Sequence, residues 1–386
     1  MALPSMVMRP SCITSRSIAR SSGICIEARA ELANMHRGPP HPAPAPGTRT
    51  PSTSIEHTFY PDPTMRPIYR DEPCRTALNR VRGMGFKWSL NPYMGCVHQC
   101  TFCFVRAFEK MADRPSDARY GTSIRVKTNI VEVLRKELAR KSWKGEQVVI
   151  GTATDPYQPA EGYFRLTRGS LQALADARTP IGLITRGPMI VRDVDLLAHA
   201  SERAKVGVTF SIPTLDPEVW RKTEPGTAPP RQRLRAIRAL IDAGIDASVG
   251  MAPILPGLSD DPQKMADVIR AARDAGATAV WTNVLYLRPG TREHFLENLA
   301  RDWPELLSAY ERLYDGRAYV TRDVLDPVKQ QVRELAKQHG IADRRPRRAT
   351  TPAERDGATD HSDDPDDPRP LPPAAVEQLS LASALR

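Results

Sequence analysis

The chain has 386 residues, 40% of them hydrophobic, so it is long enough for one large or two ordinary globular domains. No apolar run approaches the ~18 residues that a membrane-spanning helix requires, which argues against a membrane protein. The net charge is +10, of which +8 lies in residues 51–341. Such an arginine excess is typical of a solvated surface, and an anionic partner such as nucleic acid stays open.

The two ends of the chain differ in composition from its middle. Residues 1–55 are rich in Ser, Arg and Pro and lack periodic apolar positions, which predicts a disordered leader. They loosely resemble a transit peptide, but a start codon placed too early would explain them equally well. Residues 341–386 are charged and broken by proline, which predicts a disordered tail with a short terminal helix. We therefore expect one folded core over residues 56–340.

Apolar and amphipathic segments alternate along this core. Short apolar runs rich in β-branched residues predict strands near 86–93 and at 147–153, 181–185, 206–212, 247–254 and 279–287. Amphipathic stretches between them predict helices at 166–177, 191–204, 230–244 and 261–276. The last two helices should end at Gly244 and Gly276. Continuously apolar strands that alternate with helices indicate an α/β fold with a parallel sheet of about six β/α units.

Three of the six cysteines, Cys96, Cys100 and Cys103, lie within eight residues directly after the first expected strand. In parallel α/β folds, chemistry gathers where loops leave the carboxyl ends of strands. A Cys-x3-Cys-x2-Cys spacing lets one loop place three thiolates around one metal centre. Cysteine usage does not fit a secreted disulfide framework, so we expect a reducing compartment, the cytoplasm.

Three kinds of site compete for this cysteine motif. A disulfide would leave an odd thiol. A zinc ion could take His98 as a fourth ligand, but zinc sites usually use paired Cys-x2-Cys knuckles, and the sequence has no second pair. A 4Fe-4S cluster held by three cysteines leaves one iron open for a substrate or cosubstrate. The spacing favours the iron–sulfur cluster, and zinc stays open.

The wider segment NPYMGCVHQCTFCFVRAF, residues 91–108, resembles the cluster motif of radical S-adenosylmethionine (SAM) enzymes, in the branch of spore photoproduct lyase and its uncharacterised relatives. The resemblance runs from about Tyr69 to Tyr314. It implies a partial (β/α)6 TIM-like barrel of the radical SAM type, flanked by the disordered ends. It also implies a 4Fe-4S cluster on Cys96, Cys100 and Cys103, with SAM on the open iron.

The activity that this resemblance implies is reductive cleavage of SAM. The product is a 5′-deoxyadenosyl radical, which abstracts hydrogen from a substrate that the sequence does not identify. The electron would come from a donor such as flavodoxin or ferredoxin. The protein's own part in such chemistry is binding, orientation and exclusion of side reactions. No residue beyond the cluster ligands is assigned a catalytic role.

The resemblance also marks candidate SAM contacts, most of them at strand ends. Each of the polar candidates has a plainer interpretation as well. The carboxylate of Asp155 could cap a helix, Arg186 could face solvent, and Glu224 could form only a salt bridge with Arg233. The candidate residues are Phe102, Thr152, Thr154, Asp155, Arg186, Ser211, Glu224 and Arg233.

The chain departs from spore photoproduct lyase itself at two points. The lyase uses a cysteine beyond its cluster motif and tyrosines beside the third cluster cysteine. Here no cysteine follows Cys103, and Phe102 and Phe104, which have no O–H donor, stand beside it. DNA lesion repair of the lyase type is therefore an alternative that these residues oppose. A non-catalytic zinc-binding module is the second alternative.

Overall fold

The computed structural model describes residues 67–343, and the expected leader over 1–55 and nearly all of the expected tail lie outside the described residues. The larger sheet has the strand order β11-β10-β9-β8-β7-β6-β3-β2. Neighbouring strands from β3 to β11 are parallel, whereas β2 pairs antiparallel with β3. The strands are β2 (Leu78–Arg80), β3 (Trp88–Leu90), β6 (Val148–Ile150), β7 (Ile181–Thr185), β8 (Val206–Ser211), β9 (Asp246–Ile254), β10 (Ala279–Val284) and β11 (Ala342–Asp343).

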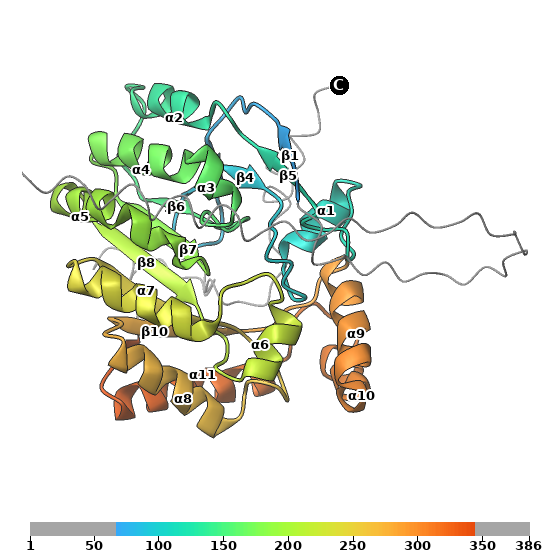
Figure 1. Cartoon of the computed structure of the whole chain (residues 1–386). Helices are drawn as coiled ribbons and strands as arrows, with labels where there is room; N and C mark the ends of the chain where they lie inside the picture. Colours follow the sequence, from blue (N-terminus) through green and yellow to red (C-terminus); the bar gives the residue numbers. More distant parts are fainter. Residues whose placement is uncertain (1–66, 344–386) are drawn as a thin grey trace, which may run out of the picture. The chain divides into compact units, whose positions relative to one another are not determined.

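Helices connect these strands and lie side by side along the sheet (Figure 1), with α2 beside α4, α4 beside α5 and α8 beside α11. This alternation confirms the predicted α/β class and the parallel sheet of about six β/α units. As predicted, α7 and α8 end just before Gly244 and Gly276, both of which have positive φ. The helices are α1 (Val105–Met111), α2 (Ile130–Leu138), α3 (Ala160–Phe164), α4 (Leu166–Asp176), α5 (Val194–Arg203), α6 (Pro217–Thr223), α7 (Pro230–Asp242), α8 (Pro262–Asp274), α9 (Thr291–Asp302), α10 (Leu307–Tyr314) and α11 (Arg322–Gln338).

The core follows from the apolar character of the strands. All three residues of β6 are buried, as are five consecutive residues of β9, Ala247–Met251. A strand that is buried on both faces appears in the sequence as a continuous apolar run, which is why these strands could be predicted. None of the described helices is both long and apolar enough to cross a bilayer.

The structure differs from the prediction at two strands and at the end of the folded core. The expected first strand, 86–93, keeps only residues 88–90 in the larger sheet, because the chain then turns and residues 93–94 join another sheet. The last expected strand, 279–287, ends at Val284, and residues 285–287 form a loop. The folded core extends past residue 340, since β11 pairs with β10.

A smaller sheet, which the sequence did not predict, supports the start of the cysteine loop. Its strands are β1 (Ile68–Asp71), β5 (Ser123–Val126) and β4 (Tyr93–Met94), in the order β1-β5-β4. Strand β1 is parallel to β5, and β4 is antiparallel to it. Since β4 ends one residue before Gly95, this sheet fixes where the loop begins.

One buried carboxylate, Glu161, ties this support to the helices behind it. Its Oε2 accepts hydrogen bonds from the Tyr93 hydroxyl at 2.5 Å and the Thr167 amide at 2.8 Å. Its Oε1 accepts from the Arg168 amide at 3.1 Å and pairs with Arg192 at 3.0 Å. Glu161 is fully buried, so its removal leaves several donors without a partner.

We expect Glu161→Ala to lower the free energy of unfolding by about 3–5 kcal/mol, since breaking a buried, hydrogen-bonded ion pair costs that much. The measurement is urea denaturation followed by circular dichroism. Glu311→Ala, at an exposed glutamate of α10, is the matched control and should change stability by no more than ~0.5 kcal/mol. Equal stability of the two variants would contradict the role given to Glu161.

Candidate functional site

The three clustered cysteines lie on the loop between β4 and α1, at the carboxyl edge of the larger sheet. Cys96 and Cys100 are buried, Cys103 is half-buried, and all three are free thiols. Burial raises the pKa of the Cys100 thiol, and the charge of Arg186 opposes that rise. Burial likewise raises the pKa of Cys103, opposed by Arg106. Positive charge on both sides of the loop thus offsets part of the cost of burying thiolates, the form that binds metals.

A buried arginine on the first helix holds the loop in shape. The guanidinium of Arg106 donates to the carbonyl oxygens of Gln99 and Cys100, both at 3.3 Å. Its Nη1 also donates to the carbonyls of Ser116 and Asp117, at 2.8 and 2.6 Å. Arg106 was not among the predicted site residues; the signal available was a charged residue three positions after the last cysteine of the motif.

Two glycines let neighbouring backbone approach the loop closely. A Cβ at Gly121, which has φ +86°, would stand 2.3 Å from the Cys96 carbonyl oxygen. A Cβ at Gly226 would stand 2.3 Å from the carbonyl oxygen of Val97. The Gly226 amide donates to the carbonyl of His98 at 3.0 Å. The loop is therefore clamped from two directions by segments far apart in the chain.

The polar turn after β6 lies directly against the cysteine loop. The Thr154 hydroxyl donates to the Gly95 carbonyl at 2.7 Å and accepts a hydrogen bond from Gln158 at 2.9 Å. The Thr152 hydroxyl accepts a hydrogen bond from the Asn91 side chain at 3.1 Å, which leaves its own proton available. The structure therefore brings this predicted turn and the cysteines together.

The carboxylate of Asp155 joins the ends of β6 and β7 to the cysteine loop. It accepts hydrogen bonds from the Thr185 hydroxyl and the Tyr157 amide at 2.7 and 2.9 Å, and from the Arg186 amide at 2.6 Å. Nδ1 of His98 lies 3.4 Å from it. Asp155 thus has a positioning role here, and its predicted contact with SAM stays a prediction.

The pKa values of His98 and Asp155 reflect their mutual contact. Burial alone would lower the pKa of His98, but the charges of Cys96 and Asp155 and hydrogen bonds to both raise it to about 10. Burial alone would raise the pKa of Asp155, but His98 and the donors from Arg186 and Thr185 lower it to about 2. The two side chains form a charged pair at neutral pH.

A chain of three charges lies near the ends of β7 and β8, with Glu224 and Arg233 fully buried and Arg186 half-buried. Arg186 Nε donates to Glu224 Oε1 at 2.5 Å, and Arg233 Nη1 donates to Glu224 Oε2 at 3.1 Å. Glu224 and Arg233 therefore form the salt bridge that was their alternative interpretation, Arg186 extends it, and their contact with SAM stays a prediction. The arrangement leaves one uncompensated positive charge, and the Arg186 guanidinium lies 5.6 Å over the Phe102 ring, which is next to Cys103.

The eight predicted SAM contacts fall into two groups by their remaining hydrogen-bonding capacity. Arg233 uses all three guanidinium nitrogens within the protein, on the carbonyls of Ala228 and Ser211, on Glu224 and on Thr227. Within residues 67–343 the Ser211 hydroxyl and Arg186 Nη1 have no hydrogen-bond partner. Groups available to a ligand belong to Phe102, Thr152, Arg186 and Ser211, whereas Thr154, Asp155, Glu224 and Arg233 are bound internally.

The described residues contain no group of three or more His, Cys, Asp and Glu side chains that converges as the ligands of one ion would. Tetrahedral zinc with thiolates at ~2.3 Å needs such convergence. His98 instead contacts Asp155. The geometry therefore gives no support to the zinc module, whereas a larger multi-iron group does not require the three thiols to meet at one point.

The comparisons with known proteins agree with this geometry. The family model of the radical SAM superfamily matches residues 90–269, a span that includes every predicted site residue. A Mycobacterium tuberculosis protein of uncharacterised function is 39% identical over 277 residues, 71% of this chain and 82% of the relative. An uncharacterised Methanocaldococcus jannaschii protein is 27% identical over 63% of this chain and 85% of its own.

Among solved structures, spore photoproduct lyase complexed with dinucleoside spore photoproduct superposes with a TM-score of 0.54. It is 14% identical over 70% of this chain and 79% of the lyase chain, so the likeness concerns the fold. A sequence match, a parallel α/β sheet and a three-cysteine loop at its carboxyl edge thus agree, and the chain belongs to the radical SAM superfamily of enzymes.

Proposed function

We propose that this radical SAM enzyme holds a 4Fe-4S cluster on Cys96, Cys100 and Cys103 and binds SAM beside it. The observation that carries the proposal is a clamped loop with three free thiols, packed against the polar turn that contains Thr152, Thr154 and Asp155. Three thiolates suit a group that must keep one metal position open. The donor set and the close backbone packing of the loop fit such a group.

When bound, the cluster would supply the electron that cleaves SAM to methionine and a 5′-deoxyadenosyl radical, which abstracts hydrogen from a substrate. The protein's part is to orient the reactants and exclude water. Arg106 fixes the loop carbonyls, and the charged pair of His98 and Asp155 links the loop to the ends of β6 and β7. Buried charges of this kind stay in place only when all their partners are present.

The SAM site that we propose uses the groups left available at the strand ends. Arg186 offers a free guanidinium nitrogen to a carboxylate, and the hydroxyls of Thr152 and Ser211 can each donate a hydrogen bond. The Phe102 ring covers this side of the loop.

We also propose that the enzyme is cytoplasmic and that it receives its electron from a reductant such as flavodoxin or ferredoxin. Lesion repair of the lyase type is not proposed, because the lyase likeness concerns only the fold.

The first prediction concerns the three cysteines. Cys96→Ala, Cys100→Ala and Cys103→Ala should each lose the brown iron–sulfur chromophore and the formation of 5′-deoxyadenosine, because two thiolates cannot hold the cluster. The measurement is anaerobic reconstitution with iron and sulfide, followed by reductant plus SAM and mass spectrometry. Cys74→Ala, at a free cysteine of a separate segment, is the matched control and should keep both.

His98→Ala separates the cluster from a zinc site. We expect this variant to keep the iron chromophore, because His98 contacts Asp155 and is not needed as a ligand. A colourless protein that binds one zinc ion and releases it on the His98 substitution would overturn the proposed function.

The second prediction concerns Arg186. Arg186→Met should weaken SAM binding by roughly 10- to 100-fold, since a charge-assisted hydrogen bond to a carboxylate is worth about 1.5–3 kcal/mol. The fold should survive, because Glu224 keeps Arg233 as its partner. Isothermal titration of the anaerobic, reconstituted protein with SAM measures this. Arg221→Met, at an exposed arginine of α6, is the control, and equal affinity in the two variants would place SAM elsewhere.

A further inference from the structure

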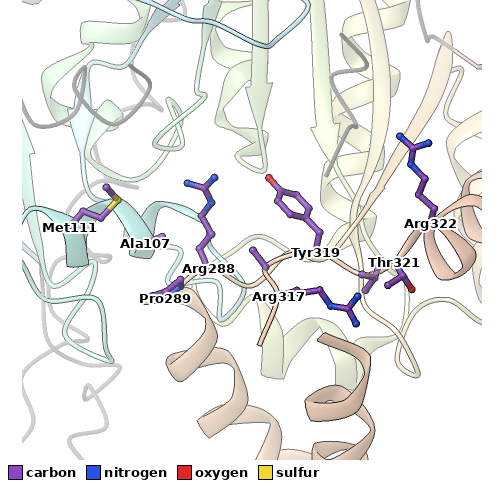
Figure 2. A pocket seen from close by; sticks show the side chains of 10 residues that line it. Ala107, Met111, Arg288, Pro289, Arg317, Tyr319, Thr321 and Arg322 are labelled. Atoms are coloured by element: carbon purple, nitrogen blue, oxygen red, sulfur yellow. The ribbon is translucent and has the colours of Figure 1, made fainter. Parts of the chain in front are cut away.

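A cavity of about 680 Å³ lies beside the cysteine loop and is not used by the site above. Its lining comes from helix α1, the loop after β10 and the segment that leads into α11. Figure 2 shows Arg288 and Arg322 on either side of Tyr319, with all three side chains directed the same way, whereas Arg317 points elsewhere. Ala107 and Met111 of α1 line the side of the cavity beyond Arg288.

Two of the three arginines of this cavity have no acidic partner in the described part of the chain, whereas Arg317 pairs with Asp315 at 3.7 Å. Arg288, Arg317 and Arg322 line the cavity, and no acidic residue does. Within residues 67–343, Arg288 and Arg322 form neither an ion pair nor a side-chain hydrogen bond. Arginines that protein carboxylates leave free are typical of sites for phosphate, which the guanidinium fork can bind through two hydrogen bonds.

An aromatic stack leads from the cysteine loop into the cavity. The ring of Phe104, the residue after Cys103, lies 6.2 Å from the ring of Tyr286. Tyr286 in turn stacks on Tyr319 at 5.3 Å with an interplanar angle of 15°. Neither tyrosine hydroxyl has a hydrogen-bond partner in the described part of the chain. Half-buried flat rings next to free arginines are the features with which proteins bind bases and phosphates together.

The backbone holds this cavity against the proposed cluster site. The Leu287 amide donates to the carbonyl of Ala318 at 2.6 Å, which joins the two lining segments. The Thr291 hydroxyl donates to the carbonyl of Cys103 at 3.1 Å, which joins them to the cysteine loop. A ligand in the cavity would therefore lie next to the reacting centre.

The geometry points to a nucleotide unit as the substrate class of this enzyme: a base stacked on Tyr319, with phosphate bound beside it by Arg288 or Arg322. The inference rests on the proposed function only in that it names what the radical would act on. The same chemistry occurs in a free nucleotide and in a single nucleic-acid strand, and the net charge of the core favours the strand.

Fluorescence anisotropy with a labelled single-stranded DNA 12-mer tests this inference on the full chain. We expect binding that weakens with salt, and a roughly 5- to 100-fold loss of affinity in Tyr319→Ala, the range for one stacked base. Tyr319→Phe, which keeps the ring, should bind like the unaltered protein. Arg288→Gln and Arg322→Gln should lower both the affinity and its salt dependence. Arg312→Gln, at an exposed arginine of α10, is the control and should change neither.

Further probes distinguish the two sources of the ligand. If adenosine 5′-monophosphate displaces the labelled 12-mer as well as unlabelled 12-mer does, the ligand is a free nucleotide. If it displaces the 12-mer less well, the ligand is a nucleic-acid strand. Both results support the cavity as the binding site. Equal binding of an abasic 12-mer or of polyglutamate would overturn the inference, as would binding that none of the cavity variants changes, or no binding at all.

SAM cleavage in the absence of any nucleotide separates this inference from the proposed function. The variants at Arg288, Arg322 and Tyr319 should keep that cleavage, since none of them contributes to the cluster or SAM residues. If the protein cleaves SAM and binds no nucleotide probe, only the substrate class is wrong. If it binds the probes through these residues and cannot cleave SAM, only the proposed function is wrong.

Discussion

The structure depends on one buried guanidinium, that of Arg106. A short loop that carries three metal-binding thiols also buries carbonyl groups that no regular secondary structure can satisfy. Arg106 donates to four of these carbonyls, two from the cysteine loop and two from the segment before Tyr120. Its ring contact with Tyr120, 4.7 Å from the centroid, covers the remaining face. Protein groups from two segments of the chain therefore hold the loop in this conformation.

The arginines around the cysteine loop all lower the cost of placing negative charge there. Arg106 opposes the burial-driven rise of the pKa of Cys103, and Arg186 does the same for Cys100. The chain of Arg186, Glu224 and Arg233 adds one net positive charge at the strand ends. Thiolates are anionic, so an excess of positive charge beside them lowers the electrostatic cost of their ionisation. The same excess suits a ligand that carries a carboxylate.

The sequence predicted the fold to the extent that burial determines it. Strands β6 to β10 are covered on both faces and therefore appear in the sequence as continuous apolar runs. Strands β1 and β2, IYRD and LNR, carry no such pattern, because a short and partly polar strand forms only where a neighbour offers its edge. The cysteine motif was visible because its spacing is local.

The contacts that orient the site were less accessible to sequence reasoning, because they join residues far apart in the chain. Arg186 and Glu224 are 38 residues apart, and the Thr291 hydroxyl reaches a carbonyl 188 residues away. Family resemblance located Asp155 and Arg233, yet it could not show that both are already saturated by protein groups. Hydrogen-bonding capacity is a property of the folded arrangement.

The cavity arginines and tyrosines lie outside the part of the chain that matches the superfamily model, and this position supports a substrate role for the cavity. The superfamily match ends at residue 269, before β10, and it includes all the residues proposed for the cluster and SAM. The tyrosines and arginines of the cavity come after that point, on the loop after β10 and the segment before α11. The reaction common to a superfamily must depend on the regions that its members share. Discrimination between substrates can depend on the regions that differ among them. The cavity is thus placed where a substrate site can change without disturbing the strand ends that hold the reacting groups.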